Sequence, residues 1–208
     1  MRESSFGGST ITTRVITTVK TDVEWNGSFY TQRVQEFSQP DSSAIGGRNT
    51  FYLSVDFDNQ ILEEAGRVLV SFDDETGDVI SARTEIFTPP IRTRFDLNAG
   101  DTFSQTYQVA SLSGTEPTIG PINEVKEETK IDRFLGIGPI NVNMNNVDTC
   151  RIETEIVTET GTVGEETEIG TFWLDKDNGL FVQAGFGSDP VDPLFQLKSA
   201  EINSASVF

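Results

Sequence analysis

Apolar and polar residues alternate along most of this chain, which is the pattern of β-strands with one buried face. The clearest run places Phe51, Leu53, Val55 and Phe57 at every second position. Threonine- and valine-rich runs elsewhere have the β-branched composition that fits a half-buried strand. No long segment has apolar residues at helical spacing. The pattern therefore predicts an all-β protein.

Turn residues separate these runs. Asn26-Gly27 lies between two strand-like segments, and this dipeptide favours a two-residue hairpin because both central positions of a type I′ turn need positive φ. Asp58-Asn59-Gln60 predicts a second turn. Pro89-Pro90 predicts a break in the sheet, since proline cannot donate a ladder hydrogen bond. We interpret that break as a boundary between two halves of the chain.

Two hairpins resemble each other. Thr50-Phe51-Tyr52-Leu53 is followed by an Asp-Asn turn and a strand ending in Ala-Gly, and Thr171-Phe172-Trp173-Leu174 is followed by the same order of features. We interpret this as an internal duplication with halves at about 10–90 and 95–204. The alternative is chance similarity between two hairpins built with common turn chemistry.

The predicted fold is an antiparallel meander of two related halves that form one strongly curved sheet or incomplete barrel. A β-sandwich is the alternative, because both architectures consist of short alternating strands. Residues 1–9 contain no apolar core of a signal peptide and are expected to form a flexible leader. Residues 10–204 are expected to form a single all-β domain.

Charge and composition exclude several functions. The chain has 33 acidic and 15 basic residues, for a formal net charge of −18, which argues against nucleic acid as a partner. It has no histidine, so Ser-His-Asp and Cys-His catalytic arrangements cannot form within it. A single cysteine, Cys150, forms no internal disulfide. No run approaches the ~18 consecutive apolar residues of a membrane span.

Candidate binding residues are mainly aromatic. If the sheet is curved, one member of each adjacent aromatic pair faces its concave side, where it either fills the core or contacts a ligand. The candidate ligand-binding residues are Trp25, Tyr30, Tyr52, Tyr107 and Trp173.

Evidence for metal, cofactor or catalytic chemistry is weak. Asp175 and Asp177 are the candidate metal ligands, but the glycine and glutamate spacing of a calcium loop is missing, which favours a tight hairpin turn. With so many acidic residues, some pair always suits a carboxylate-based hydrolase, and that remains a remote alternative. We predict no cofactor and no catalytic residue.

Residues 140–185 carry a resemblance to a known group. Asn143 to Thr154 form a short threonine- and cysteine-bearing strand, followed by Thr171-Phe172-Trp173-Leu174 and the glycine-led run Gly179-Leu180-Phe181-Val182. This order resembles the TapB-like group of bacterial envelope proteins and related lipoproteins. Asp177-Asn178 departs from it, standing where that group often has Pro-Gly. The resemblance implies an extracytoplasmic protein (periplasmic, outer-membrane anchored or secreted) with a possible lipid anchor upstream.

Together these features lead us to expect a non-enzymatic envelope or secreted β-protein. Its expected partner is a small apolar ligand or another envelope protein, bound on the concave face of the sheet. The alternative is an extracellular carbohydrate-binding or adhesion module, which requires exposed, coplanar aromatic rings.

Overall fold

The computed structural model describes residues 2–6, 9–40, 44–114, 122, 124–142, 145–160, 164–176, 181–187, 195–197, 201–202 and 205–206. All regular secondary structure in these residues is β-strand. The strands are β1 (Arg2–Phe6), β2 (Ser9–Trp25), β3 (Ser28–Ser38), β4 (Gly47–Asp56), β5 (Ile61–Phe72), β6 (Val79–Arg94), β7 (Thr102–Gly114), β8 (Glu124–Val142), β9 (Asn145–Thr160), β10 (Gly164–Asp175), β11 (Phe181–Phe186), β12 (Phe195–Leu197), β13 (Glu201–Ile202) and β14 (Ala205–Ser206).

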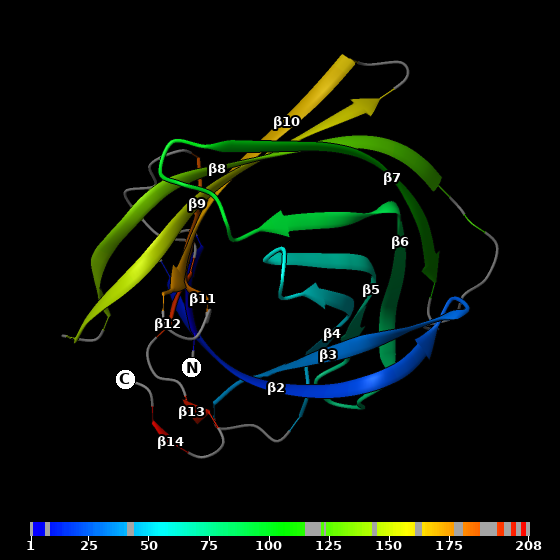
Figure 1. The fold of residues 1–208 in the computed structure, drawn as a ribbon. Coiled ribbons are helices and arrows are strands. Elements are labelled where there is room, and N and C mark those ends of the chain that lie inside the picture. The colour runs from blue at the N-terminus through cyan, green and yellow to red at the C-terminus, as the bar shows by residue number, and fades with distance from the viewer. Residues whose placement is uncertain are drawn as a thin grey trace.

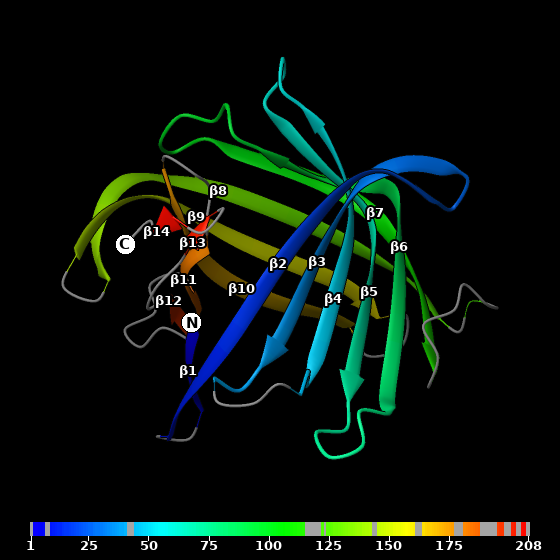
Figure 2. The same ribbon diagram turned by 90° about the horizontal axis from the view of Figure 1, so that it is seen from below.

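The main sheet is an antiparallel meander. From β2 to β12 each strand pairs with the next strand in sequence, and Figures 1 and 2 show these strands following one another side by side in chain order. The prediction of an all-β antiparallel meander is therefore confirmed. Strands β13 and β14 form a separate two-stranded ladder. The described residues contain no helix with the length and hydrophobicity of a membrane span.

The first and last strands of the meander are joined through β1. Residues Arg2 to Phe6 lie in the segment expected to be a flexible leader, yet they pair with β2 and, from Arg2 to Ser4, with β12. Within the described residues, β12 in turn pairs with β11 at two positions. The ladders on either side of β12 are therefore short.

The hairpin between β2 and β3 forms as its sequence predicts. Asn26 and Gly27 have φ values of 49° and 77°, the left-handed conformation that a type I′ turn needs at both central positions. Trp25 and Ser28 close the ladder on either side of this turn.

The expected sheet break at Pro89-Pro90 is wrong. Strand β6 runs through both prolines, which lie at positions without ladder partners: pairing with β7 ends at Thr88, and pairing with β5 resumes at Ile91. The Gln105 side chain replaces the missing backbone pairing. Its amide nitrogen donates to the Pro90 carbonyl and its amide oxygen accepts from the Arg92 N–H, both at 2.8 Å. A proline pair is tolerated here because a neighbouring side chain satisfies the polar groups beside it.

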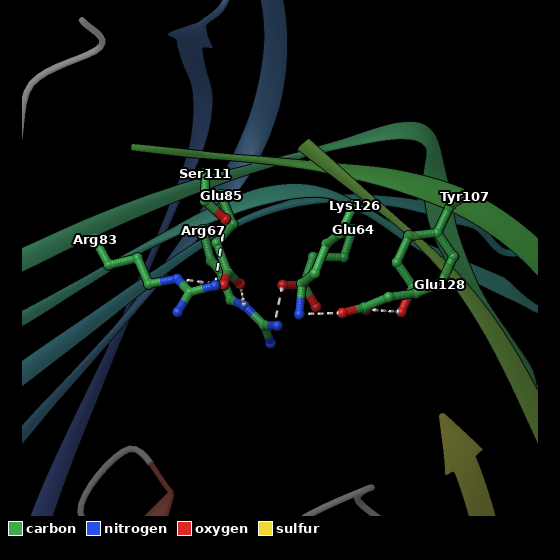
Figure 3. A network of polar contacts seen from close by, with 8 residues as sticks. All are labelled: Glu64, Arg67, Arg83, Glu85, Tyr107, Ser111, Lys126 and Glu128. Carbon is green, nitrogen blue, oxygen red and sulfur yellow. Dashed lines mark hydrogen bonds and ion pairs between the residues drawn. The ribbon is translucent and has the colours of Figure 1, made fainter. Parts of the chain in front are cut away.

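The two faces of the sheet have different compositions. We define the inner face as the one that carries Arg67, Glu85, Ser111, Tyr107 and Glu128. The ladder register places them together, since Arg67 is opposite Glu85, Glu85 is opposite Ser111, and Tyr107 is opposite Glu128. Figure 3 shows their side chains projecting from the same side of the strands. The opposite side is the outer face.

An aromatic cluster covers part of the outer face. The Trp25 ring stacks on Tyr52 with 4.4 Å between centroids and meets Tyr30 edge-on at 6.1 Å. Ala65 completes the buried cluster, and Val68 and Ile86 pack against it. Ring packing therefore holds the tip of the β2–β3 hairpin against β4, β5 and β6. Aromatic pairs of this kind stabilise the fold beyond what burial of their apolar surface contributes.

The two hairpins with similar sequences also share a structural irregularity. In β4–β5 the register shifts between Tyr52 and Leu53, and in β10–β11 it shifts between Trp173 and Leu174. Tyr52 and Trp173 are equivalent in the sequence comparison, but the residue skipped by the ladder is Ala65 in β5 and Val182 in β11, and these two are not equivalent. The two hairpins therefore differ in register, and the bulges do not support the proposed duplication.

Gly66 is the contact point beneath the Trp25 ring. A Cβ at this position would lie 2.1 Å from Trp25 Cη2 and 2.5 Å from the Glu85 carbonyl oxygen. We expect Gly66→Ala to lower the free energy of unfolding by about 1–3 kcal/mol, because the clash involves backbone as well as the ring. Urea denaturation followed by tryptophan fluorescence measures this change.

Gly138→Ala is the matched control, since Gly138 also lies within a strand and a Cβ there meets nothing within 4 Å. Equal stability losses in the two variants would contradict the packing described for Trp25.

Candidate functional site

Glu85 is the centre of a charged network on the inner face. Its carboxylate accepts from Arg67 Nε at 2.6 Å and lies 2.7 Å from Arg83 Nε, while Arg83 Nη2 donates to Ser111 Oγ at 3.3 Å. The Glu85 side chain is 7% exposed, whereas the two arginines are 35% and 40% exposed. The carboxylate is thus buried between cations that solvent still reaches (Figure 3).

A second group lies one strand further along. The Tyr107 hydroxyl donates to Glu128 Oε2 at 2.9 Å, and Lys126 Nζ lies 2.5 Å from Glu128 Oε1. Tyr107 is 2% exposed. Its burial and the neighbouring Glu128 carboxylate both raise the pKa of the phenol well above its usual value. Tyr107 is therefore a neutral hydrogen-bond donor that keeps its proton.

A third group continues along β8. Lys130 Nζ lies 2.5 Å from Asp132 Oδ2, and the other Asp132 oxygen accepts from Thr154 Oγ1 at 2.7 Å. Lys130 also donates to Thr93 Oγ1 at 3.1 Å. Since Thr93 is on β6 and Lys130 on β8, this contact spans the intervening strand β7.

Glu64 and Arg33 lie at the β3–β5 side of the same face. Glu64 Oε1 is 3.9 Å from Arg67 Nη1, too long for a hydrogen bond. Burial raises the pKa of Glu64, although Arg67, Arg33 and Lys130 oppose the shift. Burial lowers the pKa of Arg33, against the attraction of Glu64. Both groups therefore occupy a poorly solvated environment.

Exposed apolar side chains adjoin this polar network. Phe29, two residues before Thr31 in β3, is 70% exposed, and Val55 in β4 is 45% exposed. Thr31 is opposite Leu53, and Leu53 is opposite Glu64, so strand alternation places Phe29 and Val55 on the inner face one row beyond Glu64. Phe57, in the following turn, is 84% exposed. The inner face therefore combines charged and apolar surface.

The five sequence-predicted aromatic residues do not form one site. Trp25, Tyr30 and Tyr52 pack together on the outer face. Tyr107 is on the inner face within the charged network and packs edge-on against Phe87. Trp173 lies on β10 beneath the guanidinium of Arg151, which is 5.3 Å from its ring centroid. The structure thus separates the five rings over three locations.

Of the two metal ligands predicted from the sequence, the structure describes one. Asp175 ends β10 and is 8% exposed, while Asp177 lies outside the described residues. No group of three or more potential metal ligands is found in the described part of the chain.

Two small pockets lie away from the network's centre. One, of about 50 Å³, is lined mostly by apolar side chains between β6 and the β8–β9 pair and includes Phe134, Cys150 and Ile152. Burial raises the pKa of the Cys150 thiol. The other, of about 260 Å³, is open and lies beside Phe37, Gly46 and Asp74. The first pocket is also lined by Asp132 and Thr93, so it adjoins the Lys130 group of the network, whereas the second contains none of the network's residues.

Sequence reasoning missed the charged network, although one signal for it was present. Lys126, Glu128, Lys130 and Asp132 occupy every second position of β8, and so share a face of the strand. Alternating charges at this spacing indicate ion pairs along one sheet face.

The chain matches no family model, no curated protein and no solved structure.

The Tyr107–Glu128 hydrogen bond makes a testable contribution to stability. We expect Tyr107→Phe to lower the free energy of unfolding by about 1–3 kcal/mol, because a buried carboxylate oxygen loses its donor. The control is Thr106→Val, which removes an exposed hydrogen bond to Thr129 from the adjacent residue pair. We expect the control to cost less than about 0.5 kcal/mol. Similar losses from both variants would contradict a special role for the buried bond.

The raised pKa of Tyr107 gives a second prediction. Free tyrosine ionises near pH 10, so Tyr107 should contribute nothing to the rise in phenolate absorbance up to about pH 11 while the protein stays folded. The ultraviolet titration curves of wild type and Tyr107→Phe should therefore coincide over this range. In about 6 M guanidinium chloride, which unfolds the chain, the variant should show one phenolate fewer.

Proposed function

We propose that the protein is a non-enzymatic binding protein for a small amphipathic molecule, held on the inner face of a curved sheet. The main observation in support is that this face bears both a prearranged polar network and a row of exposed apolar side chains, Phe29 and Val55. Ion pairs position the polar groups before a ligand arrives, which lowers the entropic cost of binding. The ligand we propose is amphipathic, and not simply apolar, because charged side chains occupy the centre of the face.

Solvent exposure supports this assignment. Arg67, Arg83 and Lys126 are 35%, 40% and 28% exposed although the carboxylates that they contact are largely buried. Partial exposure keeps these cations hydrated, which lowers the cost of burying their partners, and it also leaves the cations accessible to a ligand. Phe29 and Val55 likewise remain exposed on the same face, where apolar surface is costly unless it is covered.

The positions of the aromatic rings favour this proposal over a carbohydrate-binding module. Sugar-stacking platforms need exposed ring faces, whereas Trp25, Tyr52, Tyr107 and Trp173 are all at most 9% exposed. The extracytoplasmic location belongs to the proposal as well, and it rests on the sequence resemblance described above.

The first experiment is a fluorescence titration with N-phenyl-1-naphthylamine, a neutral amphipathic dye that brightens in apolar surroundings. We expect saturable binding to the wild-type protein with one site per chain. Val55→Asp should weaken this binding about tenfold, since it replaces apolar contact on the inner face with a charge.

Ile16→Asp provides the control. Ile16 and Val55 are each 45% exposed on a strand, but Ile16 is opposite Glu36 and next to the inner-face positions Val15 and Thr17, so it lies on the outer face. Its substitution should change the affinity by less than about twofold. Absence of saturable binding by the wild type would overturn the proposed function, and equal losses in both variants would overturn the inner-face location.

A further inference from the structure

The smaller of the two pockets is a cavity on the inner face. Its volume is about 50 Å³, and Phe134, Ile152 and Cys150 line it on the side of β8 and β9. Phe134 continues the two-residue alternation of Glu128 along β8, so its side chain belongs to the inner face. Ile152 is opposite Phe134 in the β8–β9 ladder and therefore shares this face.

The rest of the cavity wall is the segment that leaves β6, residues 93–97. Hydrogen bonds hold this segment and the turn that follows it. The Phe95 N–H donates to the Gln60 carbonyl at 2.9 Å, and the Gly100 N–H donates to the Phe134 carbonyl at 2.8 Å. Both walls of the cavity are therefore fixed by contacts within the sheet.

The polar side chains in the wall already have partners. Asp132 and Thr93 both contact Lys130 Nζ, at 2.5 Å and 3.1 Å, and Arg94 forms an ion pair with Asp96. A water molecule in a cavity needs about two to four polar partners, which these satisfied groups do not offer. The cavity therefore suits an apolar occupant better than water.

The remaining side chains of the wall are apolar or weakly polar: Phe95, Leu97, Phe134, Cys150 and Ile152. The Cys150 thiol is only a weak hydrogen-bond donor. Burial raises its pKa, as expected where a thiolate would be poorly solvated. Nothing in this part of the wall requires a polar group on the occupant.

A line of inner-face positions connects the cavity to the exposed apolar surface at Val55. Val55 is opposite Leu62 in the β4–β5 ladder, and Leu62 is opposite Thr93 in the β5–β6 ladder. Thr93 itself lines the cavity. Since neighbouring strands are about 4.8 Å apart, Val55 is about 10 Å from Thr93 across the sheet.

We propose that this cavity receives the end of an unbranched alkyl chain, the tail of the amphipathic ligand. The chain runs along the line from Val55 to Thr93. Its end lies in the cavity against Ile152 and Cys150. This inference rests on the proposed function and specifies the shape of the ligand's apolar part.

The size of the cavity favours a narrow chain over a ring. Apolar cavities of about 150 Å³ bind benzene, so a cavity of about 50 Å³ is too small for a six-membered ring. The end of a linear chain is narrow enough to enter. It also restores dispersion contacts that the atoms lining an empty cavity lack.

Cys150 serves as the reporter for the first test, because it is the one cysteine of the chain. Mass spectrometry of the intact protein follows its labelling by iodoacetamide at about pH 8.5, near the pKa of a free thiol. We expect 1-octanol, at about ten times its dissociation constant, to slow this labelling about tenfold. The concentration that gives half of the full protection measures the affinity.

2-Cyclohexylethanol is the matched probe. It has the same number of carbon atoms as 1-octanol and the same hydroxyl group, but its apolar part ends in a ring. We expect half-protection of Cys150 to need about tenfold more of this compound, because the ring does not enter the cavity. Equal protection by the two alcohols overturns the narrow-chain assignment.

Two variants of β9 test the location. Ile152 and Ile156 lie on the inner face and are both partly buried, but only Ile152 lines the cavity, whereas Ile156 is opposite Lys130. Ile152→Phe should fill the cavity and weaken 1-octanol binding about tenfold. Ile156→Phe, the control, should change it by less than about twofold. Thermal unfolding checks that each variant is folded, and the comparison of the two alcohols on wild type needs no variant.

The outcomes separate the two proposals. Binding of N-phenyl-1-naphthylamine without protection of Cys150 by 1-octanol leaves the proposed function standing and overturns the cavity assignment, since the cavity is then a packing void only. Equal weakening by the two phenylalanine variants overturns the location of the chain end. Absence of dye binding overturns the proposed function and the inference with it.

Discussion

The structure depends on pairing buried carboxylates with cations from the same strand and from neighbouring strands. Glu85 is the clearest case, since its side chain is 7% exposed and contacts arginines from β5 and β6. A carboxylate in this position without its cations would be strongly destabilising, because the cost of removing a charge from water would be uncompensated. The register of β5, β6 and β7 is therefore constrained by charge as well as by apolar burial. A slip of one residue would turn every one of these side chains to the opposite face.

The use of charge on one face and aromatic packing on the other explains how a chain with modest hydrophobic content forms a sheet of this size. Trp25, Tyr52 and Ala65 bury apolar surface on the outer face. Phe87, Tyr107 and Val109 form a smaller apolar cluster on the inner face, beside the ion pairs. Apolar contacts and satisfied polar contacts thus alternate across the sheet, and neither face is uniformly hydrophobic.

Much of the fold was predictable because it follows from local sequence. Alternation of apolar residues and the Asn26-Gly27 turn depend on neighbouring positions, and the strand and the turn that they predict are both present. The buried face was predicted less well, since Val55 is 45% exposed whereas the intervening Tyr52 is buried. The prediction at Pro89-Pro90 failed because the Gln105 side chain, 15 residues from Pro90, satisfies the backbone there. A distant side-chain contact of this kind has no signature in the local sequence.

The candidate site was less predictable for a related reason. Arg67 and Glu85 are 18 residues apart, and only the ladder register brings them within 2.6 Å. Aromatic residues were the candidates in the sequence because they are large and few. The face of the sheet on which each one lies depends on strand parity and on bulges. The charges along β8 were the accessible signal, since their two-residue spacing specifies a common face once that segment is recognised as a strand.

The pairing of β1 with β12 has a consequence for how the chain reaches its native state. Every other ladder of the main sheet joins strands that follow one another in sequence, whereas Arg2 pairs with Leu197. Bringing together residues so far apart carries a larger loop-closure entropy than forming any single hairpin. We therefore expect hairpin-by-hairpin growth of the meander to come first and the β1–β12 contact last, so that the slowest step in folding is topological in origin.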